Sequence, residues 1–154
     1  MLSLSDKTLV MVVGPSSVGK STLMNEVVRL DPSFGRVRSF TTRPPRSNDE
    51  AGQYLYMTRE ELAEKSALGQ VITDVVYPTT GHHYGTVPES FGSPNNLLDT
   101  LAHSVSDYRA LPFARTVTIS LTTEPEAWSA WLKERFPDGG DDMRRRLEEA
   151  VLSI

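Results

Sequence analysis

The chain has 154 residues, of which 38% are hydrophobic and 23% are charged, so it can fold as one globular domain with a sizeable core. A formal net charge of -4 argues against a broad nucleic-acid-binding surface, because such surfaces are normally basic. The absence of cysteine excludes disulfides and thiolate metal sites. No run is long and apolar enough to cross a membrane, and Met1–Lys7 lacks the apolar stretch of a signal peptide, so we expect a cytoplasmic protein.

The first predicted elements surround a glycine-rich loop. The apolar run Thr8–Val13 is rich in β-branched residues, which predicts a strand buried on both faces. Lys20–Leu30 has apolar residues at helical spacing and stops before Asp31 and a proline, where a helix is expected to end. Between them, Gly14–Ser21 fits the pattern G-x-x-x-x-G-K-[ST] at every fixed position. A strand, this loop and a helix together predict a binding site for a nucleoside triphosphate.

The residue types of this loop suit phosphate chemistry. Gly14 and Gly19 allow a tight turn whose backbone N–H groups point inward around a phosphate. Lys20 supplies a cation for the β- and γ-phosphates of ATP, and the hydroxyl of Ser21 is placed to ligate Mg²⁺. The residues predicted to bind ATP are Gly14, Ser16, Ser17, Val18, Gly19, Lys20, Ser21 and Thr22.

A stiff loop that carries two arginines follows a second predicted strand, Arg36–Phe40. The segment Ser39–Tyr54 contains two adjacent prolines and several turn formers, and proline restricts both its own backbone and that of its predecessor. Arg43 and Arg46 are therefore expected on an extended, rigid segment. Taken alone, this segment is equally well explained as a solvated basic loop.

This loop resembles the acceptor-binding signature of guanylate kinases, and it follows a P-loop of the matching type, GPSSVGKSTL. The turn Gly81–Thr86 resembles the family's G-x-Y-Y-G-[ST] turn. Leu97–Leu101 and Ala102–Leu111 resemble its Leu-Asp-Ile-Asp strand and the helix that follows. Ala127–Arg135 and Met143–Ala150 resemble the two arms of its lid. The resemblance spans nearly the whole chain, and its first half is the more specific half.

The elements between these motifs fit the same family. Thr58 and Glu61 form a capping box, which predicts a helix that runs to Leu68 and stops at Gly69. The remaining predicted strands are Tyr54–Met57, Gln70–Val76 and Arg115–Leu121. The resemblance implies an α/β fold, a three-layer P-loop kinase core with a parallel sheet. The core would consist of residues 1–34, 89–123 and 148–154, with an acceptor-binding region at 35–88 and a lid at 124–147.

The resemblance also implies roles for individual side chains. Arg43 would hold the acceptor phosphate bidentately and so belongs, with Lys20, to the implied catalytic residues. The lid arginines Arg135 and Arg146 would close on the transferring phosphoryl group. Asp74 is the candidate for the carboxylate that reads the purine, although it is shorter than the usual glutamate and needs a one-residue insertion to align. The residues implied for acceptor binding are Ser39, Arg43, Arg46, Tyr54, Asp74, Tyr84, Thr86 and Asp99.

Simpler explanations compete with these roles. The tyrosines can be core residues, the small hydroxyls local caps, and the lid arginines part of a solvated helix face. The chain also departs from the family: Trp131 and Leu101 stand where it has an arginine and an aspartate, and the family usually continues beyond Ile154.

The expected activity is that of a nucleoside monophosphate kinase, which transfers the γ-phosphate of ATP to GMP or dGMP. Two alternatives remain open: a kinase for a different nucleoside monophosphate, and a guanylate kinase-like binding module without turnover. Lys20 and Ser21 favour an enzyme, because a nucleotide-free scaffold has no need of them. The expected partners are ATP and the monophosphate, with neither nucleic acid nor membrane, and the protein would be a monomer or homodimer.

Overall fold

The computed structural model describes residues 3–47, 49, 51–76 and 80–151, which fold as two compact units. The first unit is formed by Val37–Gly92 together with the N-terminal residues. The second is formed by Ser5–Arg36 together with the chain from Ser93 onward. The polypeptide therefore leaves the second unit after Arg36 and returns to it at Ser93, and each unit has a four-stranded sheet of its own.

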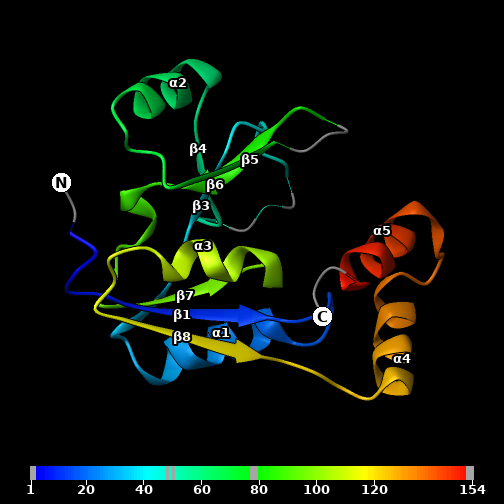
Figure 1. The fold of residues 1–154 in the computed structure, drawn as a ribbon. Helices are drawn as coiled ribbons and strands as arrows, with labels where there is room; N and C mark the ends of the chain where they lie inside the picture. Colours follow the sequence, from blue (N-terminus) through cyan, green and yellow to red (C-terminus); the bar gives the residue numbers. More distant parts are fainter. Residues whose placement is uncertain (1–2, 48, 50, 77–79, 152–154) are drawn as a thin grey trace. The chain divides into compact units, whose positions relative to one another are not determined.

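The second unit is built on a parallel sheet (Figure 1). Its strands are β1 (Thr8–Val13), β2 (Phe34–Arg36), β7 (Asn95–Asp99) and β8 (Arg115–Ser120), in the order β2-β7-β1-β8. All neighbouring pairs are parallel. The last five residues of β1 are buried, because a central strand of such a sheet is covered on both faces. The predicted buried strand is therefore confirmed, and so is the α/β class with a parallel sheet.

Helices lie on both sides of this sheet. Helix α1 (Lys20–Leu30) has the predicted bounds, and its fully buried Met24 packs against apolar side chains of β1 and β7. Figure 1 shows α3 (Val105–Arg109), preceded by the 3₁₀ turn Ala102–Ser104, on the side of the sheet opposite α1. After β8 the chain forms α4 (Pro125–Arg135) and α5 (Gly140–Val151).

The first unit has a mixed sheet. Its strands are β3 (Ser39–Thr41), β4 (Tyr54–Tyr56), β5 (Thr73–Val76) and β6 (His83–Thr86), in the order β4-β3-β6-β5. Strands β3 and β4 are parallel, whereas β6 runs antiparallel to both β3 and β5. Phe40 is fully buried and forms a small core with Val87 and with Leu62 of α2 (Arg59–Ala67).

Local signals account for the ends of α2. The hydroxyl of Thr58 accepts a hydrogen bond from the Glu61 backbone N–H, and the Glu61 carboxylate accepts one from the Thr58 N–H, so the predicted capping box is present. At the other end Gly69 has a φ of 66°, the left-handed conformation that commonly terminates a helix. A 3₁₀ turn at Pro88–Ser90 then leads out of the unit.

Three predicted elements are corrected. Arg36–Phe40 is not one strand: β2 ends at Arg36 and β3 starts at Ser39 in the other sheet, because the chain passes from one unit to the other between them. Strand β5 begins only at Thr73 rather than Gln70. The helix expected at Ala102–Leu111 is shorter, with a 3₁₀ turn in place of its first residues. The predicted division into core, acceptor-binding region and lid stays a prediction.

Candidate phosphoryl-transfer site

The loop between β1 and α1 has a backbone shape that only a few residue types adopt. Gly14 has a φ of 147°, and a Cβ at this position would lie 2.5 Å from the carbonyl oxygen of Leu121. Gly19 caps α1 with a φ of 102°. Ser17 has a φ of 66°, a left-handed conformation that costs energy for a residue with a side chain and is concentrated at functional sites. The loop thus has a curved backbone that leads directly into the first turn of α1, where the backbone N–H groups have no partner within the helix.

The ammonium group of Lys20 folds back over this loop. Its Nζ donates hydrogen bonds to the carbonyl oxygens of Gly14, at 2.8 Å, and Pro15, at 3.1 Å. The carboxylate of Asp99, the last residue of β7, lies 3.9 Å from the same nitrogen. A cation and a carboxylate therefore meet at the carboxyl end of a parallel sheet, which is where open α/β sheets bind their ligands.

The donor atoms at this edge suit Mg²⁺. Ser21 offers a hydroxyl in the first turn of α1, and Asp99 offers carboxylate oxygens, and magnesium prefers oxygen ligands. Within the described ranges no three His, Asp or Glu side chains gather as a cage for a metal ion. Magnesium at nucleotide sites needs no such cage, because it keeps several waters and binds phosphate oxygens. The residues present therefore fit a magnesium ion that arrives with a nucleotide.

Helix α4 lies against the outside of the loop. The indole N–H of Trp128 donates a hydrogen bond of 2.7 Å to the carbonyl oxygen of Ser16. The guanidinium of Arg135 donates one of 3.2 Å to the hydroxyl of Ser17. Sequence reasoning predicted Arg135 near the phosphates but missed Trp128. The seven-residue spacing of these two side chains, two helical turns, was a usable signal because it puts them on the same face of α4.

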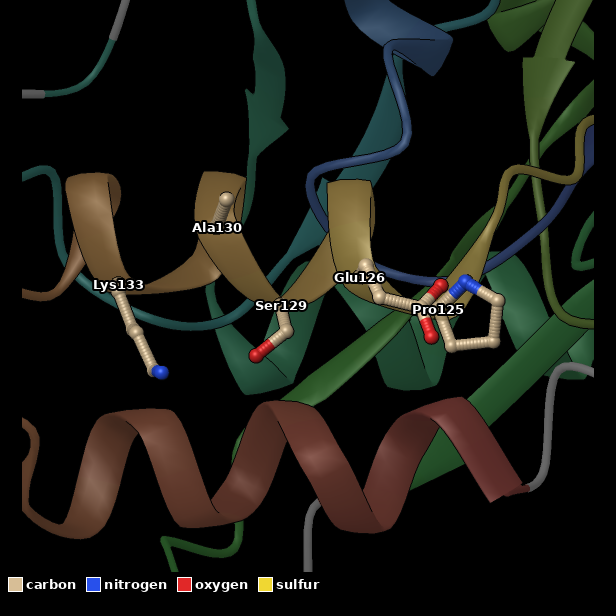
Figure 2. A pocket seen from close by; sticks show the side chains of 5 residues that line it. All are labelled: Pro125, Glu126, Ser129, Ala130 and Lys133. Carbon is tan, nitrogen blue, oxygen red and sulfur yellow. The ribbon is translucent and has the colours of Figure 1, made fainter.

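The opposite face of α4 lines a separate hollow. Figure 2 shows the side chains of Glu126, Ser129 and Lys133 on the face that is turned toward the neighbouring α5. This hollow has a volume of about 480 Å³ and shares no lining residue with the loop. Arg146, the other predicted lid arginine, belongs to α5 and is half-buried. Its predicted contact with a phosphoryl group stays a prediction.

In the first unit, one face of the mixed sheet gathers most of the predicted acceptor residues. Strand pairing aligns Ser39 with Tyr54, and side chains alternate between faces along each strand, so these two lie on one face with Tyr84 and Thr86. The ring centroids of Tyr54 and Tyr84 are 6.2 Å apart. The guanidinium carbon of Arg43 lies 5.4 Å from the Tyr54 ring centroid. The structure thus brings together an arginine and two tyrosines that the sequence places far apart.

An acidic side chain that sequence reasoning missed holds Arg43 in place. The carboxylate of Asp49 accepts hydrogen bonds from the Arg43 guanidinium at 2.8 Å, the Tyr56 hydroxyl at 2.6 Å and the Arg46 backbone N–H at 2.7 Å. The Arg43 side chain is only 7% exposed and that of Asp49 14%. The pair holds the pKa of Asp49 well below its usual range and raises that of Arg43. The donors around Asp49 are of the kinds that also bind phosphate oxygens.

Backbone bonds fix the start of this loop to the sheet. The N–H of Thr42 donates to the carbonyl of His83, and the N–H of His83 donates to the hydroxyl of Thr42. The backbone N–H of Arg43 donates to the buried hydroxyl of Thr41. The predicted rigidity around Arg43 thus has a second cause besides proline. The Arg46 side chain, by contrast, is exposed.

Asp74 lies on the other face of the sheet. It pairs in register with Gly85, whereas its neighbour Thr73 pairs with Thr86, so Asp74 points away from the face that carries Tyr84. Its carboxylate is 2.9 Å from Nδ1 of His83. The structure therefore does not bring Asp74 to the other predicted acceptor residues. Thr86 is fully buried, and its hydroxyl shares a 2.8 Å hydrogen bond with that of Thr73.

The parallel sheet and the loop that joins β1 to α1 define a P-loop nucleoside triphosphate-binding protein. The family model described as guanylate kinase matches residues 6–93, more than half of the chain. The chain belongs to the guanylate kinase family. This membership confirms the predicted resemblance and the prediction of a guanylate kinase-like phosphotransferase.

Individual guanylate kinases are also similar to this chain in sequence or in fold. A guanylate kinase of Thermosynechococcus vestitus is 38% identical over 79 residues, which are 51% of this chain and 40% of that protein. A guanylate kinase of a Nostoc species is 35% identical over 152 residues, which cover 95% of this chain and 75% of that protein. The crystal structure of guanylate kinase from Anaplasma phagocytophilum superposes with a TM-score of 0.58 at 21% identity, over 99% of this chain and 72% of that one. This last likeness supports the fold.

Proposed function

We propose that this protein transfers the γ-phosphate of ATP to GMP or dGMP, giving ADP and GDP or dGDP. The observation that supports the proposal is that one chain of this family contains both a P-loop and a second cluster of cationic and hydroxyl groups. The second unit has a complete P-loop with Lys20 over it, and the first has an arginine–tyrosine cluster around Arg43. A kinase needs two phosphate-binding sites, one for the donor nucleotide and one for the acceptor nucleotide.

The donor side uses the loop and the start of α1. Backbone N–H groups of the loop bind phosphate oxygens, and Lys20 exchanges its bonds to the Gly14 and Pro15 carbonyls for bonds to the β- and γ-phosphates. Ser21 and Asp99 would hold Mg²⁺, which neutralises phosphate charge when bound. Arg135 already reaches Ser17 of the loop and supports the predicted contact with the transferring group.

The acceptor side uses the face of the mixed sheet. Arg43 and Arg46 bind the phosphate of the monophosphate, with the hydroxyls of Tyr54 and Tyr84 beside them. No general base is required, because a phosphate monoester has its second pKa near 6 and is largely dianionic at neutral pH. The acceptor oxygen attacks the γ-phosphorus while the bond to the β-phosphate oxygen breaks. The protein supplies position and charge.

Two observations bear on which base the acceptor carries. Guanine presents adjacent N–H donors that a carboxylate accepts, but Asp74 points to the other face of the sheet. That placement is the observation that favours the second candidate, a kinase for a different nucleoside monophosphate. Family membership weighs toward GMP or dGMP.

The proposed partners are ATP and the monophosphate. Among the helices of the described ranges, none is long and apolar enough to span a membrane. The cytoplasmic location, the absence of a nucleic-acid partner and the monomeric or homodimeric state remain predictions.

A labelling experiment tests the function. The purified protein is incubated with Mg²⁺, GMP and ATP that carries a radioactive γ-phosphate, and the nucleotides are separated by chromatography. The proposal expects the label in the β-phosphate of GDP. Label only in free phosphate would show hydrolysis without transfer and would contradict the proposal.

A further inference from the structure

The second tryptophan of α4, Trp131, is exposed beside the P-loop. Trp131 is 43% exposed to solvent, whereas tryptophan side chains are mostly well buried. It lines an open depression of about 460 Å³ together with Gly19, Thr22 and Glu26 and their neighbours in the loop and in α1. Part of Trp131 is thus exposed to solvent in a depression at the edge of the P-loop.

The position of Trp131 is fixed from both sides along its helix. Trp128, one turn before it, and Arg135, one turn after it, each bond to the loop. Leu132, the next residue, is buried. The indole of Trp131 is therefore carried on a helix that is already tied to the loop, so little ordering is needed when a ligand meets it.

The chemistry of an indole limits what it can bind here. An indole has no charge to offer a phosphate, unlike the arginine that the guanylate kinase family has at this position. It offers a flat apolar face, and the depression beside it adds apolar carbon from Val18 and Leu23. A nucleotide whose phosphates lie in the loop over Lys20 has only one flat apolar part, its base.

The depression lies where the base of such a nucleotide has room. The phosphates bind inside the loop and at the first residues of α1, and Gly19 and Thr22 border both this region and the depression. The nucleoside must leave the loop past one of its rims. Trp131 lies exposed at this rim. Stacking of a base on an aromatic side chain is favourable for every base, because each base has a π-face.

We propose that Trp131 is the stacking platform for the purine base of the phosphoryl donor. This inference rests on the proposed function only where it calls the nucleotide the phosphoryl donor. The contact between Trp131 and the base requires nucleotide binding but does not require catalytic turnover. Trp131 is a binding residue that discriminates a nucleotide from bare triphosphate.

The test measures equilibrium binding by calorimetry, in the presence of Mg²⁺, of ATP and of inorganic tripolyphosphate to the parent, Trp131→Leu and Trp131→Phe. Leucine keeps an apolar, helix-forming side chain but removes the aromatic face, and phenylalanine keeps that face. We expect Trp131→Leu to weaken ATP binding about 5- to 150-fold, the range for one stacked base, and Trp131→Phe to retain most of the affinity. Tripolyphosphate, which has no base, should bind all three proteins equally.

Two results would overturn the proposal: parental ATP affinity in Trp131→Leu, or an equal loss for ATP and tripolyphosphate, which would assign Trp131 to the shape of the loop. If the parent binds ATP through Trp131 but transfers no phosphate, the proposed function fails while this inference stands. In an active protein, Trp131→Leu should raise the KM for ATP and leave the KM for GMP unchanged.

Discussion

Arg46→Ala is the cleanest perturbation of the proposed acceptor site. Arg43 is buried against Asp49 and Tyr54, so its removal would take away the charged partner of the Asp49 carboxylate and open a space as well as remove a ligand contact. The Arg46 side chain is exposed, and its bond to Asp49 comes from the backbone N–H, which alanine keeps. The substitution therefore removes the guanidinium and little else.

The size of the effect follows from this geometry. A charge-assisted hydrogen bond is worth about 1.5–3 kcal/mol, which corresponds to roughly a tenfold to 150-fold change in affinity. Solvent exposure screens the contact, so we expect the lower end, about a tenfold rise in the KM for GMP. Stability should change by less than about 0.5 kcal/mol, because an exposed substitution breaks no buried contact.

The assay measures initial rates with GMP varied at saturating ATP and Mg²⁺, together with thermal unfolding. Arg38→Ala is the matched control, since Arg38 is an exposed arginine of the same unit outside the proposed site and carries the same charge. It should leave the KM for GMP unchanged. An unchanged KM in Arg46→Ala, or the same rise in Arg38→Ala, would refute the assignment of Arg46 to the acceptor phosphate.

Three further predictions follow from individual contacts. Lys20→Ala should abolish phosphoryl transfer and shift the unfolding temperature little, since the hydrogen bonds of the Lys20 side chain go to carbonyl oxygens of the loop and its ammonium lies near the Asp99 carboxylate; measurable turnover would exclude the mechanism. Asp74→Ala should leave the ratio of kcat/KM for GMP and AMP unchanged because Asp74 points to the opposite face, whereas a collapsed ratio would show that it reads the base. Asp49 has a lowered pKa in the fold, so the stability it contributes is present above its ordinary pKa near 4 and is lost as pH falls further. Urea unfolding between pH 7 and pH 3 should be less pH-dependent in Asp49→Asn, and parallel curves would contradict this.

Local motifs were predictable from the sequence because their chemistry is complete within a few residues. Gly14–Ser21 forms the expected loop, and α1 starts and ends where its glycine and proline signals predict. The capping box of α2 is a further case, since both of its bonds join residues three positions apart.

Features set by pairing between distant segments were not predictable in the same way. The face on which Asp74 lies depends on the register of β5 against β6, and a shift of one residue would reverse it. The break between β2 and β3 depends on the chain passing from the second unit into the first. Asp49 was missed because its partners, Arg43 and Tyr56, meet it only after the loop has folded back on the sheet.

The most direct test of phosphoryl transfer is ADP release by the purified protein, followed with a coupled assay, across five acceptors: GMP, dGMP, AMP, CMP and UMP. The account predicts ADP formation that requires an acceptor, is fastest with GMP or dGMP, and disappears in Lys20→Ala. A rate that is the same with and without every acceptor, or no ADP above the Lys20→Ala background, would contradict it.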